Sequence, residues 1–540
     1  MSGSGTWGNA PARARRTAGR IAVAIGVTAL AVAGPAALTA GADAGLPSLP
    51  GATCAATNWP MFGHDPGRSF ASADSCITAA GAAALRPKWF ANTSSPITGQ
   101  PAVVDGVVYA GDFAGKFHAF KASDGSDAWP ALDAHAYDNS HTDYGTFPDS
   151  PAVATVHGHK VVVVGGGATL FVLDALTGAH LAHLCLDRVD TTCQGATGYT
   201  TEIEASPVVI PHANGAADIL VGTDVNEHNP SGPAGLYDIS LDANVHTLTP
   251  KWMFDPETGI TWPGLPTAQT KPGTEHGCND VWSSPTVVGN LVVFGVGNCN
   301  HPEQVAPSQV KLVESTIAVN VSTGAFVWQG APHAPNNGLD VDFGATPNAL
   351  PAASGAAVGE GGKDGVYYAY SATGAPAWHT QVATGSDIGG MIASTAVGSL
   401  GALHGNHPAV FAATAIPVST SDPQGSITND LTSPNQALGL HALDLVTHQV
   451  AWDAPVGPAY GAAIYDNGLV FVPDTFTDSL LVLDGDTGAI LRAQPLNVPP
   501  AGPAAISGRD VFIGSGTTSN SPPLNTLSSF GGLWAFTTTP

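Results

Sequence analysis

The sequence predicts an all-β, eight-bladed β-propeller, and a repeated motif is the main reason. In each copy an apolar strand leads into a tight turn, often Thr-Gly or Asp-Gly, and a second strand that commonly ends in Trp. Seven copies are present, at residues 119–129, 172–182, 236–252, 318–328, 369–378, 442–452 and 482–492. Repeats spaced by roughly 40 to 76 residues are typical of propeller blades, each a four-stranded sheet.

The turn and the Trp have separate physical roles. Gly provides the positive φ that a tight hairpin turn requires. Trp provides a large apolar surface with which one sheet packs on the next. One sheet cannot bury both of its faces alone, so the units must stack in a closed array.

Two incomplete copies complete the ring. The segment LRPKW ends at Trp89, and the chain finishes with the strand-like segment 531–540. Paired side by side, they form an eighth blade that joins the two ends of the chain and removes exposed sheet edges. The high Gly and Pro content, 65 and 43 residues, agrees with many turns and few helices.

The first 44 residues read as a secretory signal peptide. Four Arg precede an apolar run from Ile21, and small residues follow around Ala44. An uncleaved anchor helix is the alternative, because the apolar run is long. We therefore predict a signal peptide at 1–44, a linker at 45–57 and a propeller at 58–540, with no membrane span in the mature chain.

The cysteines and the charge fit an exported protein. Six Cys suggest local disulfides in an oxidising compartment, the simplest set being Cys54–Cys76, Cys185–Cys193 and Cys278–Cys299. No CxxCH sequence occurs, so this chain attaches no c-type haem. The net charge of −25 argues against binding to nucleic acid. The predicted location is secreted or extracytoplasmic.

Several segments outside the repeat resemble the quinoprotein alcohol dehydrogenases, and most of all the polyvinyl-alcohol dehydrogenase group. The segments are WPMFGHDPGRS (59–69), DVWSSPTVV (280–288), FGVGN (294–298), DVDFGATPNAL (340–350) and GKDGVYYAY (362–370). Members of that family bind pyrroloquinoline quinone (PQQ) and Ca²⁺ on the propeller axis and oxidise alcohols. The resemblance thus implies PQQ and Ca²⁺ as cofactors.

The resemblance also assigns roles to individual residues. Trp282 would form the floor under the quinone, and Lys363 would bond its carbonyl oxygens. Glu227 and Asn298 would be ligands of Ca²⁺, with Asp224 as a further candidate. The structural alternatives are a blade-packing Trp, a solvated loop Glu, a turn Asn and an ordinary hairpin turn.

The general base is less well defined by the resemblance. Methanol-type members carry an acidic residue where this chain has Gly362. Asp364 is one candidate replacement, and the acidic pair Asp340 and Asp342 supplies another, with Asp342 as our second catalytic candidate.

Two functions follow as hypotheses. The first is a secreted PQQ- and Ca²⁺-dependent dehydrogenase that oxidises alcohols, polymeric ones such as polyvinyl alcohol included. Its electrons would pass to a separate acceptor such as a cytochrome c, because the chain has no haem of its own. The alternative is a non-catalytic propeller that binds protein or polysaccharide through its rim loops.

Overall fold

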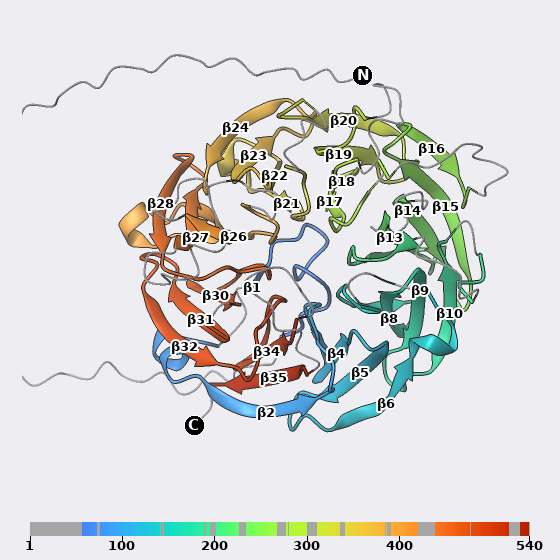
Figure 1. The fold of residues 1–540 in the computed structure, drawn as a ribbon, viewed down its shortest axis with the longest axis horizontal. Helices are drawn as coiled ribbons and strands as arrows, with labels where there is room; N and C mark the ends of the chain where they lie inside the picture. The colour runs from blue at the N-terminus through green and yellow to red at the C-terminus, as the bar shows by residue number, and fades with distance from the viewer. Residues whose placement is uncertain are drawn as a thin grey trace, which may run out of the picture. The chain divides into compact units, whose positions relative to one another are not determined.

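Eight sheets arranged as blades around a central axis form the fold (Figure 1). The computed structural model describes residues 57–538 apart from fifteen gaps of different lengths. These gaps are 73–75, 141, 143–144, 188–190, 195–200, 226–233, 267–276, 279, 300–309, 335–340, 384, 386–389, 419–437, 476 and 518–529.

Each of the first seven blades is an antiparallel meander whose first strand lies nearest the axis. In blades 1 to 4 the strands are β3 (Ala102–Val104), β4 (Val107–Gly111), β5 (Lys116–Lys121), β6 (Asp127–Asp133); β7 (Ala152–Val156), β8 (His159–Gly166), β9 (Thr169–Asp174), β10 (His180–Cys185); β12 (Val208–Pro211), β13 (Ala217–Val225), β14 (Gly235–Leu241), β15 (Leu248–Asp255); and β17 (Thr286–Val288), β18 (Leu291–Val296), β19 (Ser315–Asn320), β20 (Phe326–Gly330). In blades 5 to 7 they are β21 (Asn348–Ala349), β22 (Val358–Gly361), β23 (Val366–Tyr370), β24 (Pro376–Gln381); β25 (Ala396–Ser399), β26 (Pro408–Val418), β27 (Leu438–Asp444), β28 (Gln449–Ala454); and β29 (Ile464–Asp466), β30 (Leu469–Asp474), β31 (Ser479–Asp484), β32 (Ile490–Pro495).

Blade 8 closes the ring with strands from both ends of the chain. Its sheet has the order β2-β35-β34-β33, in which β2 (Arg86–Asn92) is the outer strand. The other three strands are β33 (Ala505–Ser507), β34 (Asp510–Ser515) and β35 (Gly532–Thr537). The eight-bladed propeller and its closure by terminal strands are therefore confirmed.

Three short strands and one short helix extend this pattern. Blade 3 gains β11 (Thr201–Glu202) and β16 (Ile260–Pro263), and blade 7 gains β1 (Ala71–Ser72). The helix α1 (Ala79–Ala83) is capped by the Thr78 hydroxyl, which accepts from the backbone N–H of Gly81.

The repeated Trp residues pack each blade on the next, as the repeat predicts. Trp129 lies against the turn glycine Gly178 of the following blade, where an added Cβ would collide with the indole. Its Nε1 donates to the carbonyl oxygen of Ala175 at 3.2 Å. Trp89, Trp252, Trp328 and Trp452 meet the corresponding glycines Gly125, Gly324, Gly374 and Gly488 in the same way. The turn glycine is thus required both for its positive φ and for its missing side chain.

The blade 6 turn departs from this rule. His448 occupies the position of the turn glycine with φ +58° and stacks on Trp378, with ring centroids 4.4 Å apart. An imidazole face here replaces the close approach of a glycine backbone.

The segment 59–72 runs through the middle of the ring, where it is drawn in blue (Figure 1). Its backbone bonds the inner strands of successive blades, from Trp59 with Val103 in blade 1 to Phe70 with Tyr465 in blade 7. Arg68 is fully buried, and its guanidinium donates to the carbonyl oxygens of Phe62, Ser206, Pro207 and Pro285. We call residues 59–72 the axial plug. Its many bonds explain why this segment departs from the blade repeat.

Two of the predicted disulfides are present, Cys185–Cys193 and Cys278–Cys299. The third prediction, Cys54–Cys76, involves Cys54, which lies outside the described residues, as do the predicted signal peptide and linker up to residue 56. Within the described part of the chain, no helix has the length and apolar character needed to cross a bilayer.

Candidate functional site

A cavity of about 220 Å³ lies on the propeller axis, and residues from all eight blades line it. The side chains that reach it come from the short segments just before each inner strand. Glu204, Trp282 and Tyr460 occupy the same place in three of these segments, two residues before Ser206, Ser284 and Ala462. The inner strands thus converge on one small, mixed polar and aromatic space.

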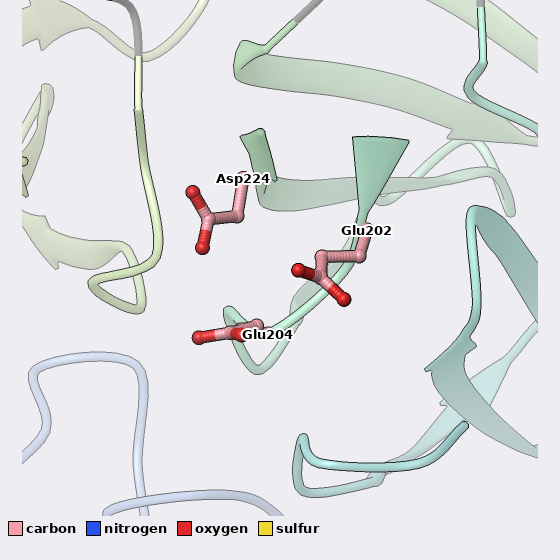
Figure 2. A group of neighbouring side chains, drawn as sticks. All are labelled: Glu202, Glu204 and Asp224. Carbon is pink, nitrogen blue, oxygen red and sulfur yellow. The ribbon is translucent and has the colours of Figure 1, made fainter. Parts of the chain in front are cut away.

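Three carboxylates gather beside this cavity in blade 3 (Figure 2). Glu202 in β11 lies directly opposite Asp224 in β13, so that both side chains leave the same face of the sheet. Glu204 follows two residues after Glu202, and one carboxylate oxygen of each residue lies within 4.8 Å of the others. Three ionised carboxylates this close repel one another, and a bound cation would relieve that repulsion. Oxygen donors of this kind suit a hard cation such as Ca²⁺.

The loop that carries Trp282 packs directly on the strand that carries Asp224. The backbone N–H of Val281 donates to the carbonyl oxygen of Thr223 at 3.1 Å. Each partner in this bond is the neighbour of a candidate site residue. The bond therefore fixes the aromatic loop of blade 4 relative to the carboxylate strand of blade 3.

Trp282 lies across the adjoining segment of blade 5. A side chain at Gly344 would overlap the indole ring, so the ring needs a glycine beneath it. On the same indole, Nζ of Lys363 lies 5.5 Å from the ring centroid, within the range of a cation–π contact. Trp282 is outside the Trp–glycine contacts that join the blades, and it is only half-buried.

Lys363 also forms an ion pair with Asp342. Its Nζ is 2.8 Å from Oδ1 of Asp342, and the two side chains are 11% and 3% exposed. The backbone N–H of Lys363 donates to the carbonyl oxygen of Asp342 at 3.1 Å, which holds the two segments together. Trp282, Lys363 and Asp342 therefore form one group.

Asp364 belongs to a different set of contacts. Its carboxylate accepts from the Tyr368 hydroxyl and from the backbone N–H of Val366, and Nε2 of His333 lies 3.5 Å away. Burial raises the pKa of Asp364, although these hydrogen bonds and His333 act in the opposite direction. Asp364 thus neighbours Lys363 in sequence, but its side chain contacts Tyr368 and His333 and not Trp282.

The predicted metal ligands have mixed outcomes. Glu227 lies outside the described residues. Asn298 is half-buried two residues beyond the end of β18, and Trp282 lies four residues before β17, so one hairpin does carry both. Sequence reasoning missed Glu202 and Glu204. The signal available was two acids spaced by one residue, in TEIEASP, just before an inner strand.

Comparisons with known proteins place this architecture. A family model described as outer membrane protein assembly factor BamB matches residues 51–223. A quinohemoprotein alcohol dehydrogenase of Pseudomonas putida HK5 matches with a TM-score of 0.64 and 18% identity, over 89% of this chain and 80% of the other. The enzyme of the same name from Comamonas testosteroni matches with a TM-score of 0.60 and 18% identity, over the same shares of the two chains. A europium-containing methanol dehydrogenase matches with a TM-score of 0.62 and 14% identity, over 89% of this chain and 98% of the other.

The chain has the propeller fold of the quinoprotein alcohol dehydrogenases. No curated protein sequence matches it significantly. In this quinoprotein-type propeller, the side chains near the axial cavity suit a metal ion and a quinone, the two groups that the fold family implies. The carboxylate cluster offers a cation three oxygen-bearing side chains, and Trp282 offers a flat aromatic surface beside the Lys363 ammonium.

Proposed function

We propose that this protein is an exported PQQ- and metal-dependent dehydrogenase that oxidises alcohols. The observation that carries the proposal is the grouping of Lys363 and Asp342 with Trp282, which lines the axial cavity, while the strand that carries Asp224 is bonded to the Trp282 loop. When bound, the quinone would accept the electrons of the alcohol, and the metal ion would supply Lewis acidity.

The chain's own residues would then have distinct roles. Trp282 would hold the flat cofactor by stacking, and Glu202, Glu204 and Asp224 would hold the cation. Lys363 would donate to oxygen atoms that gain negative charge. Asp342 would take the hydroxyl proton of the alcohol, because its carboxylate is held next to Lys363, which lies over the Trp282 ring. We favour Asp342 over Asp364 as the base, since Asp342 shares a partner with Trp282.

The finer assignments are part of the same proposal. Asn298 and Glu227 remain candidate metal ligands, and polymeric alcohols remain candidate substrates through the likeness to the polyvinyl-alcohol group. A separate protein such as a cytochrome c would receive the electrons. The two disulfides support export to an oxidising compartment.

A dye-linked assay tests the proposal. The purified protein would be incubated with PQQ and either Ca²⁺ or a lanthanide such as Eu³⁺, then supplied with short and polymeric alcohols and an artificial acceptor. Alcohol-dependent dye reduction that needs both additions supports it. Tight metal binding without quinone binding would contradict it.

A second candidate is a non-catalytic propeller that binds other macromolecules. It is favoured by the family model for an assembly factor, which matches blades 1 and 2 and the first part of blade 3, and by Gly362 at the position of the family's acid. This candidate predicts no quinone binding, so the same assay separates the two.

A further inference from the structure

A belt of hydroxyl groups surrounds the axis and joins neighbouring blades. In five successive contacts, a hydroxyl oxygen accepts a hydrogen bond from a backbone N–H of the preceding blade. The acceptors are Ser150, Ser206, Ser284, Thr346 and Ser394, at 2.7, 3.0, 2.8, 3.2 and 3.0 Å. We call these five residues the hydroxyl belt. Each lies two residues before an inner strand, which gives the belt its regular spacing.

The belt leaves a set of buried donors. A Ser or Thr hydroxyl has one proton to donate in addition to the lone pairs that accept. In these bonds all five oxygens act as acceptors, and in the described part of the chain no protein acceptor receives the five hydroxyl protons. All five residues are at most 5% exposed, and all five line the axial cavity. Buried donors of this kind almost always have a partner.

The rest of the lining restricts what that partner is. Glu204 brings a carboxylate, which only accepts when ionised, and Tyr460 brings a phenol whose pKa is raised by burial. An anion would be repelled by Glu204, and a cation accepts no hydrogen bond from a hydroxyl. In the protein without cofactor or metal ion, a neutral molecule that both donates and accepts satisfies every group. Phe62 of the axial plug also lines the cavity and restricts its size.

We propose that the axial cavity binds an ordered cluster of water molecules held by the hydroxyl belt. A volume of about 220 Å³ accommodates several waters, each taking roughly 30 Å³ in the liquid. Every water would accept from the belt and donate to Glu204, Tyr460 or another water. Glu204 belongs to both the cavity lining and the carboxylate cluster, so this cluster would hydrate the carboxylates from the axis. Trp282 lines the same cavity, so the water cluster is proposed for the cofactor-free protein, and its test needs no dehydrogenase activity.

A crystal structure that shows ordered solvent tests the proposal directly. We expect solvent peaks within hydrogen-bond distance of at least three of the five belt hydroxyls. In Thr346→Val, which keeps the side-chain shape, the peak at that position should disappear. The matched control is Thr286→Val, which removes an equally buried hydroxyl that bonds Pro347 away from the cavity. Its axial solvent should be unchanged.

Soaked crystals separate water from other occupants. A bromide soak without an anomalous peak, and an ethanol soak that leaves the density unchanged, support water. A bromide peak would identify an anion site, and ethanol density would identify a site for small alcohols; either would overturn the proposal. A wild-type crystal structure with no solvent density in the axial cavity would by itself overturn the proposal.

Discussion

Nζ of Lys363 lies 5.5 Å from the centroid of the Trp282 ring, although 81 residues separate the two in sequence. Trp282 belongs to the loop before blade 4, and Lys363 to the β22–β23 turn of blade 5. The absence of a side chain at Gly344 lets the indole reach across this blade boundary. An aromatic face, a cation and the Asp342 carboxylate thus share one place.

Replacing Trp282 with Ala should weaken PQQ binding by at least about fivefold, because stacking on an aromatic face contributes about 1 kcal/mol or more. The melting temperature should fall less than for a repeat Trp, since Trp282 is only half-buried and does not pack on one of the turn glycines. Fluorescence titration and thermal unfolding measure the two effects. Trp534→Ala, at a half-buried tryptophan of blade 8, is the control and should leave the affinity unchanged. Equal loss in both variants would mean that Trp282 has no special role.

Asp342→Asn should reduce turnover at least a hundredfold and also destabilise the fold. The change leaves the Lys363 ammonium nearly buried without its counter-charge, which costs about 3 kcal/mol. Asp364→Asn is the matched comparison, because it changes the neighbouring acid with its separate partners. Steady-state kinetics with saturating PQQ distinguish the two. If Asp364→Asn lost more activity than Asp342→Asn, the assignment of the base would be reversed.

Glu204→Gln should lower the affinity for Tb³⁺, a luminescent probe of Ca²⁺ and lanthanide sites, by at least tenfold. The change removes one of three charges from the carboxylate cluster. Glu257→Gln is the control, because Glu257 lies in the turn between β15 and β16 and is not one of the three clustered carboxylates. Unchanged Tb³⁺ binding in Glu204→Gln would exclude the cluster as the metal site.

Glu360 should make the fold less stable as pH rises. It is fully buried, its carboxyl group accepts from the Thr316 hydroxyl, and burial raises its pKa well above the usual value. A raised pKa means that the folded state favours the protonated form. Its stabilising contribution is full below the unfolded pKa of about 4.3 and is lost as pH rises through the folded value. Glu360→Gln should therefore flatten the decline in melting temperature with rising pH; an unchanged slope would contradict this.

Gly178→Ala should destabilise blade 2 more than Gly158→Ala does. Both glycines have positive φ, +73° and +87°, so backbone strain should destabilise both variants by a similar amount, about 1 kcal/mol. A methyl group at Gly178 would also strike the Trp129 indole, whereas nothing lies within 4 Å of one at Gly158. Urea unfolding measures the difference. Equal losses would show that the Trp contact adds nothing beyond the turn conformation.

The fold could be predicted because its cause is local and repeated. The turn glycines and Trp residues recur at nearly fixed distances, and Trp89 with the last strand revealed the closure of the ring. The axial plug carries no repeat, so its bonds to successive inner strands were not foreseen. Arg68 shows the difficulty: a lone Arg in a Gly-rich segment usually lies in solvent, yet here burial lowers its pKa to about 9.

The candidate site was only partly accessible to sequence reasoning. Trp282 and Lys363 stand out because they interrupt the repeat, and a resemblance gave them roles. Glu202 and Asp224 come together through the pairing of β11 with β13, across a register that the sequence does not reveal. The hydroxyl belt leaves a signal in the sequence, a Ser or Thr two residues before each of five inner strands. The sequence does not show that these hydroxyls face one cavity and bond neighbouring blades, because that depends on how the blades close into a ring.

The most direct test of the central claim is a titration of the mature protein with PQQ, followed by Trp fluorescence, with Ca²⁺ present and again after chelation. The proposed site predicts saturable quenching at micromolar PQQ or below, dependent on the metal and lost in Trp282→Ala. Quenching that is absent, or that is the same with chelator and in Trp282→Ala, would contradict a quinone site on the propeller axis.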